Sequence, residues 1–325
     1  MITATEITGM YGIIPTPANP GADRVDARNT VDVEETARLV DQLVADGVSG
    51  IIALGTTGEC PTLSEDDFDV VVDVVTEAVA DRVPTFLGAT EAGGHSTARR
   101  LRKVVDSGAT GALLGLPMWQ PLTNEMAVDF YAQISETFPE LAIMVYANTR
   151  AFRQTFPVEF WEQVANAAPT VTSAKMSRGP ELERMLEVTG NRINFVPSDM
   201  VVHDFATRAP ETTTACWATA AGMGPEPSIA LMDALDRGDA EGADRAAADI
   251  AWANEPLAHI FGNPEVFASY NIQVEKARID AAGYCRTGPV RSPYNHLPAE
   301  FAAAAAECAE RWQELRRRLA AGTGR

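Results

Sequence analysis

Short apolar runs rich in β-branched residues alternate with longer amphipathic stretches along most of the chain. The apolar runs have the length and composition of buried strands. They cover residues 11–17, 49–54, 84–90, 111–117, 141–147, 170–176, 193–198 and 212–219. Between them, apolar residues recur at helical spacing, as in residues 33–47, 64–82 and 96–109. Ser64 before one such stretch and Gly47 at the end of another are typical helix caps. The pattern predicts repeated strand–helix units.

Strands that are apolar throughout must be covered on both faces, which is typical of a parallel sheet. Eight strand–helix units within about 240 residues match the size of a (β/α)₈ TIM barrel. An open doubly wound sheet is the second choice of fold, because no GxGxxG motif follows the first strand. After Pro225 the pattern is helical throughout. We therefore expect a barrel over residues 1–235 and a C-terminal helical extension over residues 236–325.

The composition narrows the classes of partner. The formal net charge of -19 disfavours nucleic acid and anionic membranes, because like charges repel. The first residues lack the pattern of a signal peptide, and no apolar run approaches the ~20 residues that span a bilayer. The four Cys and four His residues are scattered, without the spacing of a metal site or a disulfide framework. We expect a cytoplasmic protein that uses no metal and acts on a small molecule.

Lysine is rare in this chain, with three residues against 23 arginines. Lys103 and Lys276 lie in amphipathic helical stretches with charged neighbours, and we expect both to be solvated. Lys175 instead ends a β-branched apolar run. Lysine differs from arginine in that it can lose its proton and act as a nucleophile. We therefore favour a chemical role for Lys175 over the alternative, a buried ion pair.

Other chemically distinctive residues fall at the ends of the predicted strands. In a barrel, the carboxyl ends of the strands surround the active site. The residues there are Thr56 and Thr57 after the second strand, Trp119 after the fourth, Tyr146 ending the fifth, Lys175 ending the sixth and Trp217 in the eighth. Each has a simpler explanation, since "GTTGE" could be a glycine-permitted turn and the aromatic residues could be core packing. Their convergence on one mouth predicts a site, in which the threonine loop offers hydroxyl and N–H donors to a carboxylate.

The "GTTGE" loop, the tyrosine ending strand five and the lysine ending strand six together resemble the dihydrodipicolinate synthase/N-acetylneuraminate lyase family. The resemblance covers nearly the whole chain. It implies a barrel with a C-terminal helical extension, usually a homotetramer, that needs no cofactor because a lysine forms a Schiff base with pyruvate. It further implies that Lys175 is this lysine, that Tyr146 relays protons, and that Thr56 and Thr57 hold the pyruvoyl carboxylate.

Two departures narrow the resemblance. The strand-four loop reads "PMW", so Trp119 stands where the synthases have tyrosine, and "YANTRAFR" at 146–153 misaligns the usual arginine. With "SYNIQVEK" at 269–276, the chain is similar to the hydratase-aldolases of polycyclic aromatic degradation, which cleave arylidene-pyruvates. The resemblance implies that Trp119 and Trp217 stack on the aryl ring and that Asn271 contacts substrate or water.

The ring substituent is a further expectation. We favour trans-2'-carboxybenzalpyruvate, because Arg150 and Arg153 could meet a ring carboxylate. Both arginines could equally be exposed loop charges, and trans-o-hydroxybenzylidenepyruvate stays open as the substrate. An aldolase for sugar-derived keto acids is disfavoured by the aromatic residues Trp119, Trp217 and Phe152. A dihydrodipicolinate synthase-like enzyme and a keto-acid-binding protein without catalysis are the remaining alternatives. The physiological direction and the oligomeric state stay open.

Overall fold

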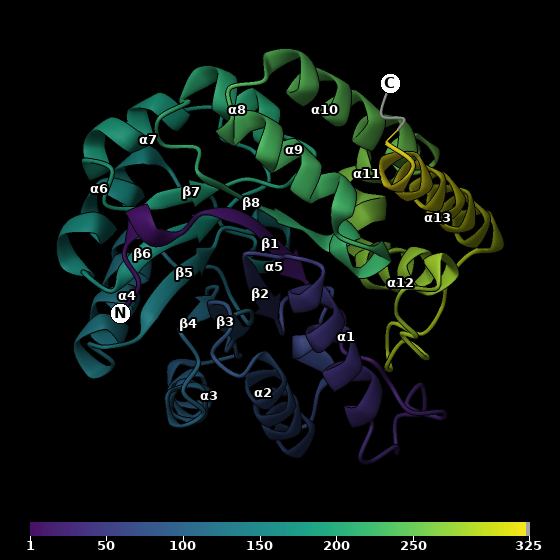
Figure 1. Cartoon of the computed structure of the whole chain (residues 1–325). Helices are drawn as coiled ribbons and strands as arrows, with labels where there is room; N and C mark the ends of the chain where they lie inside the picture. Colours follow the sequence, from purple (N-terminus) through teal and green to yellow (C-terminus); the bar gives the residue numbers. More distant parts are fainter. Residues whose placement is uncertain (323–325) are drawn as a thin grey trace. The chain divides into compact units, whose positions relative to one another are not determined.

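The computed structural model describes residues 1–322, and its strands form one eight-stranded sheet (Figure 1). The strand order is β7-β6-β5-β4-β3-β2-β1-β8. The strands are β1 Gly9–Ile13, β2 Gly50–Ala53, β3 Thr85–Gly88, β4 Gly111–Leu114, β5 Ala142–Tyr146, β6 Val171–Lys175, β7 Asn194–Val196 and β8 Ala215–Ala218. Just past β7, the Trp217 N–H of β8 donates to the Pro197 carbonyl at 2.9 Å, which links the two ends of this order. The predicted (β/α)₈ barrel is confirmed.

Helices follow the strands as the alternation predicted. They are α1 Val33–Ala45, α2 Glu65–Val79, α3 Gly94–Asp106, α4 Asn124–Thr137, α5 Thr149–Phe152, α6 Val158–Ala167, α7 Leu182–Thr189, α8 Val202–Arg208, α9 Glu226–Asp236, α10 Ala240–Asn254, α11 Ala258–Phe261, α12 Pro264–Ala282 and α13 Ala299–Ala320. The one-turn helix α5 directly after β5 was not predicted. Among residues 1–322, we find no helix with the length and hydropathy that crossing a bilayer requires.

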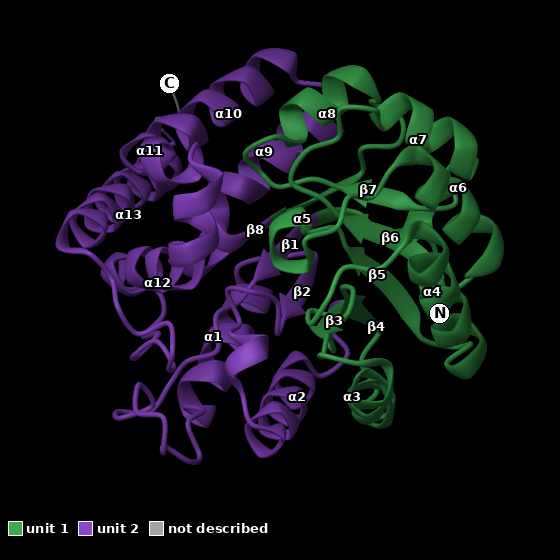
Figure 2. Cartoon of the chain, turned by 180° about the vertical axis from the view of Figure 1, so that it is seen from behind, with its two compact units in different colours: residues 1–9, 84–217 green, residues 10–83, 218–325 purple. Residues whose placement is uncertain are grey.

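The chain forms two compact units (Figure 2). The first contains residues 1–9 and 84–217, and the second contains residues 10–83 and those from 218 onward. In the second unit, α13 packs against α10 and α12. These are the helices expected of a C-terminal extension, and its boundary near residue 235 stays a prediction.

An aromatic cluster covers the sheet of the first unit on its helical side. Tyr131 of α4 and Phe160 and Trp161 of α6 are fully buried, with edge-to-face ring contacts between neighbours at 5.9 and 4.9 Å. Trp161 also meets Phe195 of β7 at 5.1 Å, and the Tyr131 hydroxyl donates to the Leu114 carbonyl of β4 at 2.8 Å. Such pairs add about 0.5–1.5 kcal/mol each beyond burial. They hold α4 and α6 against the strands that carry the predicted site.

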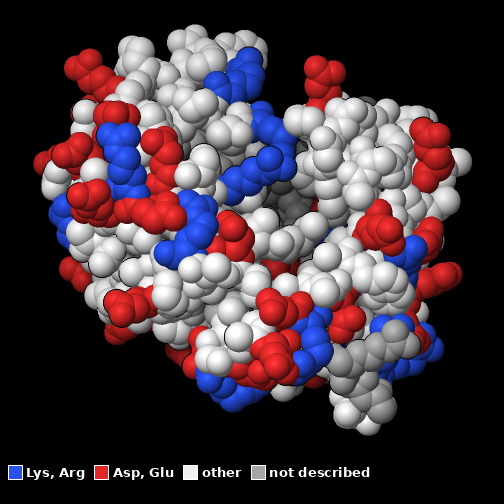
Figure 3. All heavy atoms as spheres, turned by 90° about the horizontal axis from the view of Figure 1, so that it is seen from above, with Lys and Arg blue, Asp and Glu red and all other residues white. Residues whose placement is uncertain are grey.

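Charged side chains are spread over the surface. On the face shown in Figure 3, acidic side chains form scattered clusters between uncharged residues, with basic side chains among them. A mixed surface with a large net charge favours solubility. The expectation that the chain does not bind nucleic acid stays a prediction.

A buried carboxylate connects α1 to the loop between α12 and α13 in the second unit. Glu35 is 1% exposed and accepts hydrogen bonds from Arg38 at 2.6 Å and from Arg286 at 3.0 Å. Burial opposes the ionisation of Glu35, but the hydrogen bonds from the two arginines outweigh it and lower its pKa to about 2. Folding therefore depends on the ionised form of Glu35.

Replacing Glu35 with Gln should change how stability depends on pH. A carboxyl whose pKa falls on folding stabilises the native state above its unfolded pKa of about 4.3, and that contribution is lost as pH falls through the folded value. Urea unfolding followed from about pH 7 to pH 2.5 should therefore show a shallower loss of stability for Glu35→Gln than for the parent. The exposed neighbour Glu34, replaced by Gln, is the control. Parallel curves for Glu35→Gln and the parent would contradict this linkage.

Candidate active site

Lys175 and Tyr146 are direct neighbours at the ends of two paired strands. The parallel register of β5 and β6 places Tyr146 opposite Lys175, and the Ala147 N–H donates to the Lys175 carbonyl at 3.1 Å. Both side chains are buried, with 7% and 9% exposed. The Lys175 Nζ lies 4.7 Å from the centre of the Tyr146 ring. The structure thus brings together the two residues predicted to be catalytic.

This pairing depends on an irregularity in β6. Ile143 pairs with Val171, but the next residue, Met144, pairs with Ser173, so Thr172 is an extra residue on the β6 side. Without this extra residue, Tyr146 would lie opposite Ala174, and Lys175 would point to the other face of the sheet. The bulge therefore sets the geometry of the pair.

Trp217 contributes the other aromatic face beside the amine. The centre of its ring lies 3.4 Å from the Lys175 Nζ. Its indole N–H donates to the Met176 carbonyl at 2.9 Å, which fixes the ring plane against the end of β6. The structure places Trp217 against the amine, and its predicted stacking on an aryl ring stays a prediction.

The Tyr146 hydroxyl is held from the loop that follows β5. It accepts a hydrogen bond from the Asn148 side-chain N–H at 3.1 Å, while the Asn148 Oδ1 caps α5 by accepting from the Ala151 N–H at 3.1 Å. The Tyr146 ring also meets the edge of Phe152 at 5.5 Å. A Cβ at Gly115 would clash with the Phe152 ring, so only glycine allows this packing. The hydroxyl and ring of Tyr146 are thus both positioned.

The two arginines predicted to meet a ring carboxylate occupy different surroundings. Arg153 adopts a left-handed conformation with φ 51°, and its Nη2 donates to the carbonyls of Met118 at 2.8 Å and Trp119 at 2.6 Å. It therefore holds the loop after β4, in which Trp119 is 81% exposed. Arg150 of α5 lines a cavity instead.

That cavity has a volume of about 290 Å³ and lies beyond the ends of β5 and β6. Its lining includes Ala147 and Met176, the residues directly after Tyr146 and Lys175, together with Arg150. Partial burial lowers the pKa of the Arg150 guanidinium below its ordinary value, although its side chain stays exposed on one side. The Tyr146 side chain opposes this shift, and the charge of Arg178 adds to it. The cavity is thus lined by the residues that follow the lysine–tyrosine pair in the sequence, and Arg150 and Arg178 give it a positive wall.

The "GTTGE" loop follows β2 in the second unit. Leu54, just before the loop, and Glu59, its last residue, adopt left-handed conformations, with φ 59° and 55°. A Cβ at Gly58 would approach the Leu54 N to 2.7 Å, so the loop needs glycine there. Thr57 is buried and Thr56 half-buried. The loop is a tight turn, and its expected binding of a carboxylate stays a prediction. Asn271 is half-buried on α12 in the same unit.

Glu59 is the anchor of this loop. Its carboxylate accepts from the Lys276 Nζ at 2.7 Å, from the Arg291 Nη1 at 2.5 Å and from the Arg291 N–H at 2.7 Å. All three side chains are at most 3% exposed. The expectation that Lys276 is solvated was therefore wrong. Helical spacing predicts that Lys276 lies in a helix, but it does not show which faces of that helix other parts of the chain cover. The face of α12 that carries Lys276 is covered, so the side chain is buried.

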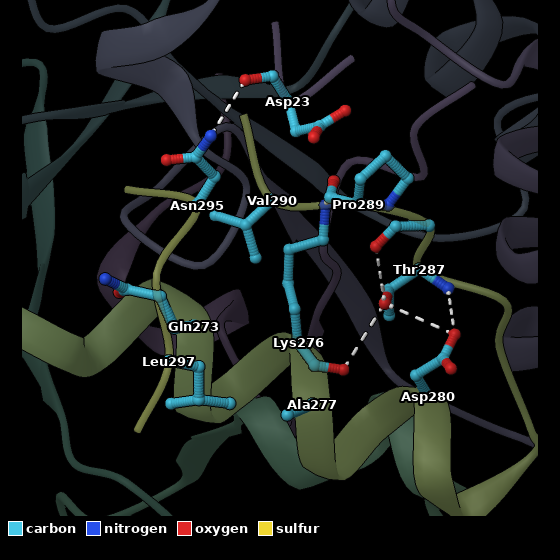
Figure 4. A pocket seen from close by; sticks show the side chains of 11 residues that line it. Asp23, Gln273, Lys276, Ala277, Asp280, Thr287, Pro289, Val290, Asn295 and Leu297 are labelled. Carbon is cyan, nitrogen blue, oxygen red and sulfur yellow. Dashed lines mark hydrogen bonds between the residues drawn. The ribbon is translucent and has the colours of Figure 1, made fainter. Parts of the chain in front are cut away.

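A second cavity lies next to Lys276 in the same unit (Figure 4). It has a volume of about 300 Å³. Asp280 accepts from the Thr287 N–H at 2.9 Å, the Asn295 side chain donates to the Asp23 carbonyl at 2.9 Å, and the Lys276 Nζ donates to the Pro289 carbonyl at 2.8 Å. These polar groups bond to one another and hold the loop after α12, so we assign them a structural role.

The sequence analysis did not predict three sets of residues that shape this site and the loop after β2. Asn148 lies within the quoted "YANTRAFR" segment, where a polar side chain two residues after the tyrosine was the available signal. Arg178 follows Lys175 by three residues, which was also visible. The ion cluster of Glu59 with Lys276 and Arg291 joins distant parts of the chain, and the sequence offered no signal for it.

The fold and the paired residues define a (β/α)₈-barrel protein that carries a buried amine at the carboxyl ends of its strands. The sequence pattern of the Dihydrodipicolinate synthetase family matches residues 12–304. The chain belongs to this family, which confirms the resemblance.

The chain is similar to proteins of known name over nearly its full length. It is 37% identical over 317 residues to the trans-O-hydroxybenzylidenepyruvate hydratase-aldolase of Pseudomonas putida, covering 97% of this chain and 95% of that one. It is 35% identical to the trans-2'-carboxybenzalpyruvate hydratase-aldolase of Nocardioides sp. (strain KP7), covering 98% and 97%. The solved structure of PhdJ bound to a substrate intermediate superposes with a TM-score of 0.94 at 35% identity, covering 98% of each chain.

Replacing Lys276 with Met should destabilise the fold. The change leaves the buried Glu59 carboxylate with one cation fewer, and breaking a buried ion pair costs about 3 kcal/mol or more. Chemical denaturation should show this loss. The same change at the partly exposed Lys103 should cost less than about 0.5 kcal/mol. Equal, small losses at both positions would mean that the ion cluster does not hold the loop.

Proposed function

We propose that this protein is a Schiff-base hydratase-aldolase that cleaves an arylidene-pyruvate into an aromatic aldehyde and pyruvate. The observation that carries the proposal is the buried Lys175 amine, in register with Tyr146 at the ends of β6 and β5. The two relatives above carry this activity in their names. A lysine is suited to the chemistry because its neutral amine forms an imine with a keto group.

The first half of the proposed reaction is imine formation and hydration. The Lys175 Nζ attacks the keto carbon, and water leaves as the protonated imine forms. This iminium is conjugated with the alkene and draws electrons from it. Water then adds at the carbon bearing the ring. One of its protons stays on the new hydroxyl, the other passes to the neighbouring carbon, and a β-hydroxy iminium results. The covalent lysine supplies the electron sink, so the proposal needs no cofactor.

The second half is carbon–carbon cleavage. Tyr146 has given its proton to the hydroxide that left as water during imine formation, and its oxygen now accepts the proton of the new hydroxyl. The electron pair of the carbon–carbon bond moves into the iminium, and the aldehyde leaves. The enamine that remains takes up a proton, and water hydrolyses it to pyruvate and free Lys175. The hydrogen bond from Asn148 holds the Tyr146 oxygen in position when it gives and when it accepts a proton.

The remaining binding roles are proposals that rest on the resemblance to the family. We assign the pyruvoyl carboxylate to Thr56 and Thr57, and contact with substrate or water to Asn271. We assign contact with the aryl ring to Trp119 and Trp217. The family also supports a homotetramer that acts in the cytoplasm on a small-molecule substrate.

Among ring substituents we favour the carboxylate, hence trans-2'-carboxybenzalpyruvate. The support is the positive wall of the cavity beside Tyr146, since guanidinium groups bind carboxylates through strong, directional hydrogen bonds. The hydroxylated substrate is the alternative, because relatives with either substrate in their names match nearly the whole chain.

Borohydride trapping with pyruvate tests the role of Lys175. Reduction should fix a pyruvoyl adduct on the peptide that carries Lys175, as peptide mass analysis can show. Lys175→Arg should form no adduct and lose turnover while keeping the fold, because arginine forms no imine. Lys103→Arg is the control and should behave as the parent. A folded parent protein without an adduct would favour the keto-acid-binding alternative.

Replacing Tyr146 with Phe tests the proton relay. The change keeps the ring packing on Phe152 and removes the hydroxyl, so kcat should fall about 10²-fold or more while KM changes little. Steady-state kinetics with an arylidene-pyruvate measure both. Tyr294→Phe, at an exposed tyrosine, is the control. A rise in KM with kcat unchanged would assign Tyr146 to binding only.

A further inference from the structure

The cavity beyond β5 and β6 has the composition of a site for a flat ring with an acidic substituent. Phe156, Met176 and Met185 give it apolar walls, which suit an aryl ring. It starts at the residues directly after Tyr146 and Lys175. A substrate joined to Lys175 through its keto carbon, with its reacting hydroxyl at Tyr146, can extend its ring into this cavity.

Two arginines from different elements line the cavity. Arg150 comes from α5 and Arg178 from the segment after β6, and both are exposed. Their positive charges act on one another. Like charges held together favour an anion between them, because it removes their repulsion. Glu181 also lines the cavity, but its carboxylate accepts from Arg184 at 3.4 Å, so the wall keeps an excess of positive charge.

The backbone that carries Arg178 is held in place. Arg208 of α8 donates to the carbonyls of Gly179 at 2.8 Å and Pro180 at 3.3 Å, and it also pairs with Glu183 at 2.7 Å. A Cβ at Gly179 would meet the Phe205 ring at 2.7 Å, so the segment lies close against α8. A fixed backbone lowers the entropy that Arg178 loses when it binds a ligand. Within residues 1–322, the Arg178 side chain has no hydrogen bond or ion pair of its own, so its donors can serve a ligand.

We infer that Arg178 and Arg150 together bind an anionic group on the aryl ring of the substrate, and that Arg178 is a specificity-determining residue. The inference rests on the proposed function and names the residue that selects within its substrate class. It replaces Arg153 in this role. The Arg153 guanidinium already bonds to two carbonyls of the loop after β4, whereas Arg178 lines the cavity.

The test compares Arg178→Gln with the parent on three substrates: trans-2'-carboxybenzalpyruvate, trans-o-hydroxybenzylidenepyruvate and unsubstituted benzylidenepyruvate. Losing a charge-assisted hydrogen bond should lower kcat/KM for the carboxylated substrate about 10- to 100-fold, mainly through KM. The other two substrates should change less than about 2-fold. Arg178→Lys keeps the charge and should retain much of the activity on the carboxylated substrate. Arg102→Gln, at an exposed arginine of α3, is the matched control.

Two results would overturn the inference. An equal loss on all three substrates would mean that Arg178 supports the fold of the site, and no loss on any would mean that the ring lies elsewhere. In both cases the pyruvate adduct on Lys175 would still form, so the proposed function would stand.

A binding measurement separates the inference from the proposed function. Benzoate should bind the parent more tightly than benzamide does, and Arg178→Gln should weaken benzoate at least about 10-fold without affecting benzamide, as NMR titration can show. This arm needs no turnover. If the parent cleaves no arylidene-pyruvate, the proposed function fails, while benzoate binding still decides whether Arg178 forms an anion subsite.

Discussion

The register between β5 and β6 is the constraint on which the geometry of the lysine–tyrosine pair depends. In a parallel sheet, residues that pair directly point to the same face, so the pairing of Tyr146 with Lys175 sends both side chains to one side. The extra residue Thr172 creates this pairing. Its hydroxyl and that of Ser173 are buried without a partner among residues 1–322. A buried hydroxyl without a partner costs free energy, so the bulge is a local loss of stability that serves the geometry of the site.

The two buried lysines show how surroundings decide what a lysine does. Burial lowers the pKa of Lys276, and the Glu59 carboxylate that it contacts opposes this, so Lys276 acts as a structural partner of Glu59 next to Arg291. Lys175 lies beside the rings of Trp217 and Tyr146, and its Nζ is 3.4 Å and 4.7 Å from their centres. The rarity of lysine in the chain therefore marks two special positions, of which only one suits imine chemistry.

The sequence predicted the elements that depend on local pattern. Strand ends were found because apolar runs stop there, so the positions of Tyr146, Lys175 and Trp217 were available before the structure. The β6 bulge was not, because it depends on pairing with β5 and leaves the apolar pattern unchanged. The burial of Lys276 was missed because it depends on Glu59, which lies far away in the sequence. Asn148 and Arg178 follow strand ends closely, but a polar residue in a loop has no pattern that separates binding from solvation.

The cavity beyond β5 and β6 has a positive wall, while the whole molecule has a net charge of -19. The local positive charge and the overall negative charge act on a substrate over different distances. At physiological ionic strength, charges more than about 8 Å apart in solvent are largely screened. The overall negative charge therefore acts weakly on an anionic substrate, and its main effect is to slow the approach of that substrate to the protein. Arg150 and Arg178 act by direct hydrogen bonds, which screening weakens less. Salt should therefore speed the encounter with a dianionic substrate more than it weakens its final binding. A substrate with a neutral ring keeps only its pyruvoyl carboxylate, so the acidic surface repels it less and its ring gains no bond to the arginines. The acidic surface and the arginine pair therefore affect a ring carboxylate in opposite senses.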